Sequence, residues 1–272
     1  MQQTGTAQGI RQRNYTPMKN FLILNSAPAR QCIRTFLLAG GFLILNFFSS
    51  AQVIIIGGKG IVNGCRLANK TVDDAGDELK YDFTWDFAGG AYLRYYFNEA
   101  TYYSKTNISL CVEALYNSYG QKYRGDILVA DTPVYSFTSR TRISSFDIPV
   151  MIHIKGQAGL YGEFGVSFGM INGVTQDYSQ DPEDVDSLNF SERSTDNLFT
   201  TSNLSAVFGF GIDSELNERL NFTAGMRLTY GITDLTEPQK QAYPGTYNET
   251  HSATIGIVIG LAYILNFYHD YH

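Results

Sequence analysis

The sequence between Tyr81 and Phe97 alternates in apolar character with a period of two residues. Its odd positions are aromatic, aliphatic or glycine, and the even positions between them include Asp82, Asp86 and Arg94. Because successive side chains of a β-strand point to opposite faces, this alternation predicts a strand with one apolar and one polar face. At seventeen residues it is far longer than the usual ~5–6 residues of a soluble strand. We therefore interpret it as a strand that crosses a membrane.

Eight segments of the chain are predicted to be such strands; seven show the alternation, whereas the first is apolar on both faces and is interrupted by glycines. They lie at about 53–67, 81–97, 106–118, 142–155, 160–170, 204–213, 220–230 and 253–267. Long polar loops follow every second segment, at about 68–79, 119–141, 172–200 and 233–250, and short turns join the others. The loop 119–141 contains β-like residues (Ile127, Val129, Tyr135 and Phe137), which suggests that its flanking strands extend beyond the membrane. This asymmetry is typical of outer-membrane barrels whose two termini lie in the periplasm. The predicted fold class is all-β, an eight-stranded antiparallel transmembrane β-barrel with long extracellular loops and short periplasmic turns; a water-soluble barrel or sandwich is the alternative.

Residues 1–51 have the composition of a signal peptide and leader. They contain five basic residues and no acidic one, and an apolar run from Phe36 to Phe48 precedes the small residues Ser49 and Ala51. The run is shorter than the ~20 apolar residues of a spanning helix. We therefore expect cleavage before Gln52, so that residues 52–272 form the barrel domain. A signal anchor is the alternative, and Met18 is an alternative start.

Charge and cysteine content exclude several classes of function. Five of the 20 basic residues but none of the 26 acidic ones lie in the leader, so the rest of the chain is strongly acidic. Nucleic acid, which binds basic surfaces, is therefore excluded as a partner. Cys65 and Cys111 fall on segments that we expect to be non-adjacent, which favours two free thiols. No group of residues has the spacing of a metal site, and we expect no metal and no cofactor.

The alternation directs six charged side chains into the barrel. They are Arg94, Glu113, Asp147, Glu163, Asp213 and Arg227. Side chains fill the interior of an eight-stranded barrel, and buried charges are costly unless they are paired. We therefore predict a structural network of ion pairs and hydrogen bonds, in which Glu113 pairs with Arg227 or with Arg94. A substrate or proton path through the lumen is the alternative.

The same pattern predicts which side chains meet lipid. Ile152, Phe168, Phe210 and Leu228 should point outward, whereas Glu113, Asp147, Glu163 and Arg227 should point inward. A shift of one residue in a strand would exchange the two sets, so the prediction is sensitive to register.

We predict no catalytic residues. His153, which shares a face with Asp147, and His251 beside Ser252 are the candidates for an enzyme acting on lipid. Neither forms a recognisable serine–histidine–acid arrangement in the sequence. The acidic loop could bind a cation weakly, and its candidate ligands are Asp181, Glu183, Asp184 and Asp186. It lacks the fixed spacing of a calcium loop, which favours a solvated surface segment.

Four stretches of the chain carry a family resemblance. They are CVEALYNSYGQKY (111–123), FDIPVMIHIKG (146–156), LYGEFGVSFG (160–169) and LNFTAGMRLTYGITDL (220–235). With these stretches in this order, residues 52–272 resemble the PorT-like outer-membrane β-barrel family of Bacteroidota. The resemblance implies an eight-stranded outer-membrane barrel and, for the namesake of the family, a role in a secretion machine.

Recognition is expected in the long extracellular loops, because segments displayed on a rigid scaffold commonly carry binding sites. The predicted function is a non-enzymatic structural, assembly or binding component of the bacterial outer membrane. Its expected partners are outer-membrane lipid and other envelope or secretion proteins. The alternatives are a barrel enzyme that modifies lipid and a narrow pore.

Overall fold

The structure is a computed structural model that describes residues 53–69, 79–96, 106–129, 132–181, 190–236 and 249–266. The predicted signal peptide and leader, residues 1–51, lies outside the described residues, as does Gln52. In the part of the chain that the structure describes, no helix has the length and hydropathy needed to cross a bilayer.

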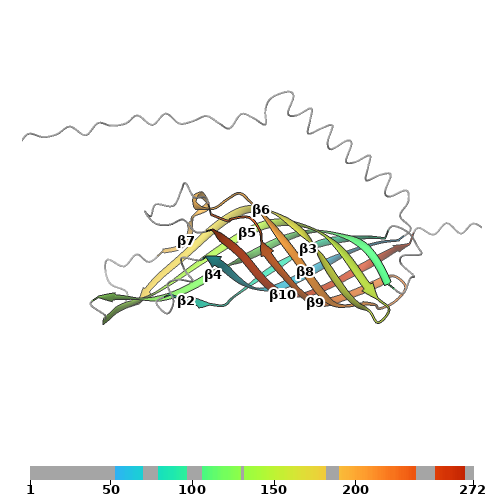
Figure 1. The fold of residues 1–272 in the computed structure, drawn as a ribbon, viewed down its shortest axis with the longest axis horizontal. Helices are drawn as coiled ribbons and strands as arrows, with labels where there is room; N and C mark the ends of the chain where they lie inside the picture. The colour runs from blue at the N-terminus through green and yellow to red at the C-terminus, as the bar shows by residue number, and fades with distance from the viewer. Residues whose placement is uncertain are drawn as a thin grey trace, which may run out of the picture. The chain divides into compact units, whose positions relative to one another are not determined.

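Long antiparallel strands close into a barrel (Figure 1). In order around it they are β1 (Val53–Asn69), β3 (Thr84–Tyr96), β4 (Thr106–Val129), β5 (Thr132–Gly156), β6 (Leu160–Asp181), β8 (Ser202–Glu215), β9 (Leu220–Gly231) and β10 (Thr250–Asn266). The first strand pairs with both β3 and β10, so the ring has no open edge. Closure satisfies the backbone groups that lipid cannot. The predicted fold class is confirmed.

Strand tilt follows from the pairing register. From Ile54, paired residues lead around the barrel and return to the first strand at Gly64, ten residues further along. An offset of this kind requires strands inclined by about 35–45° to the barrel axis. The inclination is visible in Figure 1. Eight strands with this tilt enclose a lumen that is just wide enough for side chains.

Several strands extend beyond the membrane-crossing part of the barrel. The β-like residues in the segment 119–141 predicted such an extension of its flanking strands, and β4 and β5 do remain paired as far as Val129 and Thr132. Likewise β6 continues into the predicted loop 172–200, where β7 (Phe190–Ser194) pairs with it. The loop prediction for 172–200 was wrong in its first part, because a strand outside the bilayer meets water on both faces and loses its apolar alternation. The predicted strand 81–97 is also interrupted at Phe83, which separates β2 (Leu79–Asp82) from β3.

The opposite end of the barrel has short connections, as predicted. Residues 157–159 join β5 to β6, and residues 216–219 join β8 to β9. In the first turn Gly159 has φ +77°, a left-handed conformation that suits glycine, and its amide donates to the carbonyl of Gly156. Val53 pairs with Asn266 at this same end, which is therefore the periplasmic end.

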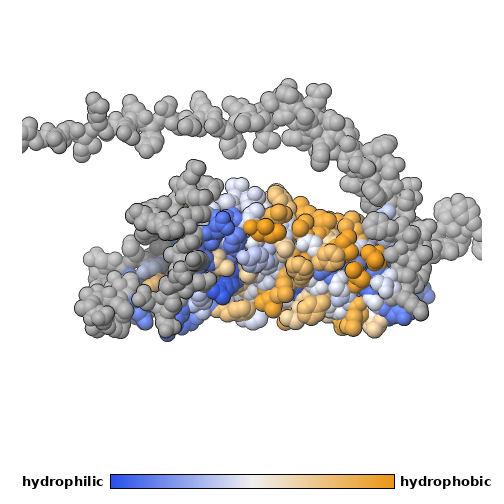
Figure 2. All heavy atoms as spheres, in the orientation of Figure 1, coloured by the Kyte–Doolittle hydropathy of each residue, from blue (hydrophilic) through white to orange (hydrophobic). Residues whose placement is uncertain are grey.

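Side-chain facing follows the predicted register. The described surface exposes Phe168 by 48%, Phe210 by 58% and Leu228 by 46%, and Ile152 is half-buried beside them on the outer wall. Figure 2 shows apolar residues gathered over the barrel wall and hydrophilic residues toward the end where β2, β4 and β5 project. An exposed apolar wall of this kind is the surface that an outer-membrane barrel presents to lipid.

A cation introduced on this wall tests the facing directly. We expect Phe164→Arg, at a site that is 49% exposed, to lower the free energy of unfolding in lipid vesicles by about 2–4 kcal/mol, because the guanidinium would lie in hydrocarbon. The matched control is Leu216→Arg in a periplasmic turn, where the cost should be about 0–1 kcal/mol. Equal losses in the two variants, measured by denaturant titration, would contradict the lipid-facing assignment.

Candidate functional site

Six side chains of Lys, Arg, Glu and Asp are buried among the described residues, and their positive and negative groups are equal in number. The cations are Lys59, Arg94 and Arg227, and the anions are Glu113, Glu163 and Asp213. All of them point into the lumen, and each comes from a different strand: β1, β3, β4, β6, β8 and β9. Three positive and three negative groups leave no net charge in the low-dielectric interior, which is the condition for burying them without prohibitive cost.

The central cluster is built around Arg227 on β9. Its Nη1 donates to Glu113 Oε2 at 2.6 Å and its Nη2 to Glu113 Oε1 at 2.9 Å, so the two side chains meet in a bidentate fork across the lumen. Its Nε also donates to Glu163 Oε1 at 3.0 Å. Lys59 contacts Glu113 and lies 4.0 Å from Glu163 Oε2. The predicted pair of Glu113 with Arg227 is confirmed.

A second cluster lies closer to the periplasmic end. Arg94 on β3 forms an ion pair with Asp213 on β8, and Asn221 donates to Asp213 Oδ1 at 2.5 Å. Lys155 lies 3.5 Å from the same carboxylate. The alternative prediction, Arg94 with Glu113, is therefore wrong: the tilt of the strands places Arg94 at the level of Asp213 instead.

His153 connects the two clusters. Its Nδ1 lies 3.6 Å from Glu163 Oε2, its Nε2 lies 3.4 Å from Asp213 Oδ2, and its ring stacks on Tyr161 with centroids 4.7 Å apart. The side chain is fully buried. It therefore separates two carboxylates inside the network and is out of reach of a lipid substrate at the barrel surface.

Asp147 points inward as predicted but stands apart from this network. It accepts hydrogen bonds from Asn117 Nδ2 and from Ser145 Oγ, each at 2.7 Å. The contacts of Asp147 in the described structure are hydrogen bonds from neutral groups, and it forms no ion pair with the charged clusters described above. It is paired with Leu115 on the neighbouring strand and lines one small cavity with Leu115 and Arg227.

Glycines on neighbouring strands make room for two of the inward carboxylates. A Cβ added at Gly209 would lie 2.6 Å from Oε1 of Glu163. At Gly169 it would lie 2.6 Å from Oδ1 of Asp147. Glycine at these two inward positions thus leaves the volume that the acidic side chains occupy.

An apolar cluster closes the lumen toward the extracellular side. Its members are Cys65, Leu67, Tyr119, Ile143, Val174 and Leu235, with Ile171 and Phe199 packed against them. Leu235 comes from the segment after β9, and backbone hydrogen bonds to Thr200 and Thr250 hold it in place. Between this cluster and Arg227 lies a cavity of about 30 Å³, which suits one or two waters. The lumen of the described barrel is therefore filled at several successive levels.

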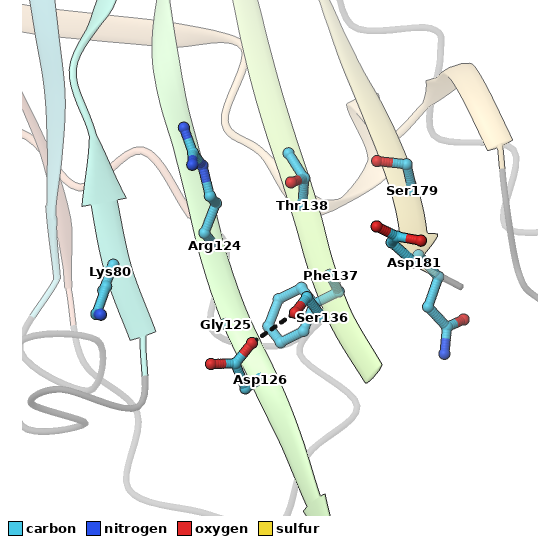
Figure 3. Close-up of a pocket in the computed structure, with 10 residues that line it drawn as sticks. Lys80, Arg124, Gly125, Asp126, Ser136, Phe137, Thr138, Ser179 and Asp181 are labelled. Carbon is cyan, nitrogen blue, oxygen red and sulfur yellow. Dashed lines mark hydrogen bonds between the residues drawn. The ribbon is translucent and has the colours of Figure 1, made fainter. Parts of the chain in front are cut away.

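Outside this closure, β2, β4, β5 and β6 form a projecting sheet with a polar hollow (Figure 3). Lys80, Arg124, Thr138 and Ser179 are paired in one row across the four strands. In the next row Ser136 donates to Asp126 Oδ1 at 2.7 Å. The hollow measures about 400 Å³ and is also lined by Gln180 and Asp181. Guanidinium, ammonium, carboxylate, hydroxyl and amide groups here could hydrogen-bond a polar ligand.

The other predicted site residues are not brought together. His251 and Ser252 are adjacent on β10 and point to opposite faces; the His251 ring lies 3.3 Å from Glu249 and 3.1 Å from the Gly231 carbonyl. Of the candidate cation ligands, Glu183, Asp184 and Asp186 lie outside the described residues, and Asp181 lines the hollow. The described residues contain no group of three or more potential metal ligands. Cys65 and Cys111 are free thiols, as predicted.

Comparison with known proteins places this geometry in a family. The sequence matches the model of the outer membrane protein beta-barrel domain over residues 40–237, which is more than half of the chain. The chain belongs to this family. Membership agrees with the closed ring of strands and its apolar wall, and the protein resides in the bacterial outer membrane with both ends of the described barrel on the periplasmic side.

Solved structures of small outer-membrane proteins are similar in fold. Neisserial surface protein A matches 76% of this chain and 95% of its own, at 9% identity and a TM-score of 0.36. Ail, the attachment invasion locus protein of Yersinia pestis, matches 79% and 99%, at 11% identity and a TM-score of 0.34. OprG from Pseudomonas aeruginosa matches 80% and 97%, at 14% identity and a TM-score of 0.30. A search of curated proteins found no match.

Sequence analysis missed three members of the network in this barrel domain. Lys59 lies between glycines in a segment that is apolar on both faces, so its strand gave no clear alternation. Lys59 is an even number of positions from the inward residues Asn63 and Cys65, so it shares their strand face, and this spacing could have placed it inside. Lys155 and the bridging role of His153 depend on which strands meet across the lumen, and that is set by the ten-residue offset.

Removal of Arg227 tests the structural role of the network. We expect Arg227→Met to lower the free energy of unfolding by about 3–5 kcal/mol, because it leaves Glu113 and Glu163 buried with Lys59 as their remaining cation. The control, Arg219→Met in an exposed periplasmic turn, should change it by less than about 0.5 kcal/mol. Combining Arg227→Met with Glu113→Gln should restore part of the loss, since it removes one charge of each sign. Identical unfolding curves for Arg227→Met and the control would refute this role.

Proposed function

We propose that this protein is a non-enzymatic binding or assembly component of the outer membrane that recognises a polar partner at its projecting extracellular sheet. The observation that supports this most is the contrast between the filled lumen of the described barrel and the open hollow on the projecting sheet. The lumen is filled by paired charges and an apolar cluster, whereas the hollow at Arg124, Thr138 and Ser179 is open and polar.

The sheet is suited to recognition by its construction. Its strands are continuations of barrel strands, so the hollow is held by the same hydrogen-bonded ladder that crosses the membrane. A rigid scaffold of this kind limits the ordering cost of binding. The two rows carry charges of opposite sign, Lys80 and Arg124 in one and Asp126 and Asp181 in the next, which favours a partner with mixed polar groups.

We further propose that the protein is related to the PorT-like family and acts together with a secretion machine. This relationship rests on the order of the four sequence stretches. Each stretch contributes one residue to the network: Glu113, His153, Glu163 and Arg227. Under this proposal the barrel anchors an assembly, and the partner is an envelope or secretion protein.

The second candidate is an enzyme that modifies lipid at the barrel wall. The observation in its favour is His251, which is half-buried on the outer side of β10, stacks on Tyr230 and contacts Glu249. Its neighbour Ser252 points inward to Asn203, however, so the pair does not supply a nucleophile and base to one substrate.

Site-specific photo-crosslinking in intact cells distinguishes the two functions. A crosslinking residue at Ser179, in the hollow, should capture a discrete partner in near-stoichiometric yield, whereas one at Phe164, on the lipid-facing wall, should not. The lipid A of overexpressing cells should keep its mass. Equal capture at both positions would contradict recognition by the sheet. Lipid A of altered mass that reverts with His251→Ala would establish the enzyme instead.

A further inference from the structure

We propose that Lys122, Arg140 and Arg142 form a binding site for the phosphate groups of a phosphorylated glycolipid in the outer leaflet. The site lies on the outer wall of β4 and β5, below the polar hollow, and it is independent of the proposed recognition function. It is called the basic shelf below.

The register of β4 and β5 places these cations in an ordered sequence of layers. The outward pairs, taken from the membrane toward the outside, are Tyr116 with Phe146, Ser118 with Ser144, Gly120 with Arg142, and Lys122 with Arg140. An aromatic pair is thus followed by two small hydroxyl residues and then by three cations. The small residues leave space on the wall between the apolar surface and the charges.

The basic shelf coincides with the border of the lipid-facing wall. Phe83 is 59% exposed and Trp85 is 62% exposed, and their rings pack edge to face with centroids 5.1 Å apart. Aromatic residues of this kind mark the interface in outer-membrane barrels. Asp82, the residue immediately before Phe83, is paired with Lys122 on β4. The cations are therefore one step beyond the interface, at the level of lipid headgroups.

The acidic side chains around the basic shelf neutralise only part of its positive charge. Asp82 Oδ2 is shared between Arg124 at 2.6 Å and Lys122 at 3.4 Å. Arg140 Nη2 lies 3.6 Å from Asp86 Oδ1. The residues paired with Arg142 are Gly120 and Thr175, neither of which is acidic. Asp177, opposite Arg140, accepts from the Glu192 amide at 2.8 Å and keeps its negative charge, so the uncompensated positive charge of the shelf is centred on Arg142.

Phosphate is the anion that this arrangement fits. Guanidinium groups bind phosphate through parallel hydrogen bonds, and a lysine adds a point charge. A lipid whose acyl chains lie along Tyr116 and Phe146 would carry its headgroup over Ser118 and Ser144, with its phosphates against Arg140 and Arg142. A lipid ligand is favoured over free phosphate because the apolar wall continues directly into the shelf, so one molecule can use both surfaces.

The test uses the chain's single tryptophan, Trp85, which lies beside the shelf. The folded protein in neutral detergent is titrated with bisphosphorylated lipid A while tryptophan fluorescence is recorded. Arg140→Ser/Arg142→Ser should weaken binding by about ten-fold or more, since each guanidinium loses a charged hydrogen bond. Arg142→Gln should give a smaller loss. Arg219→Ser, at the periplasmic end, should bind as the wild type does, and an unboiled gel shift confirms that each variant is folded.

Three results would overturn the proposal. The first is unchanged affinity in the folded double variant. The second is equal binding of dephosphorylated lipid A by the wild type, which would leave only the apolar wall as the ligand site. The third is displacement of the lipid by millimolar inorganic phosphate alone, which would assign the shelf to free phosphate rather than to lipid.

Discussion

A charge inside a lumen too narrow for bulk water has to be neutralised by another side chain, and the architecture of this barrel depends on that requirement. Arg227 meets it by reaching across the lumen to Glu113 and Glu163, and Lys59 completes the set. A neighbouring strand carries glycine where the Glu163 side chain needs volume, at Gly209. A network with three cations and three anions holds non-neighbouring strands together, which the backbone ladder alone cannot do. The same network leaves little room for transport.

Much of the barrel can be read from its sequence because lipid imposes a strict alternation on every strand that crosses it. The facing of Phe210 and Arg227 and the pair of Arg227 with Glu113 were predictable for that reason. The partner of Arg94 was not, because contacts across the lumen depend on the ten-residue offset between Ile54 and Gly64, which no single strand encodes. The extension of β4 and β5 was suggested by the β-like residues between 119 and 141, but the continuation of β6 to Asp181 was missed because its two faces both meet polar surroundings. Lys59 was missed because glycines and aliphatic residues conceal the facing of its strand.

The proposed function therefore lies on the outside of the barrel. The filled lumen provides stiffness, and the projecting sheet continues that stiffness beyond the membrane, where its polar hollow is accessible. Below the hollow, the basic shelf would fix the height and rotation of the barrel in the outer leaflet, so that the sheet is held in a defined orientation. One set of continuous strands would thus link lipid binding, mechanical rigidity and recognition.

The most direct test of this account is the conductance of the purified wild-type protein in a planar lipid bilayer. A lumen filled by ion pairs and closed by the cluster around Leu235 predicts no stable current steps at neutral pH, even at high protein density and high salt. Reproducible steps that scale with the conductivity of the bulk electrolyte would show a continuous water-filled path, and would contradict the central claim that the lumen is a structural core.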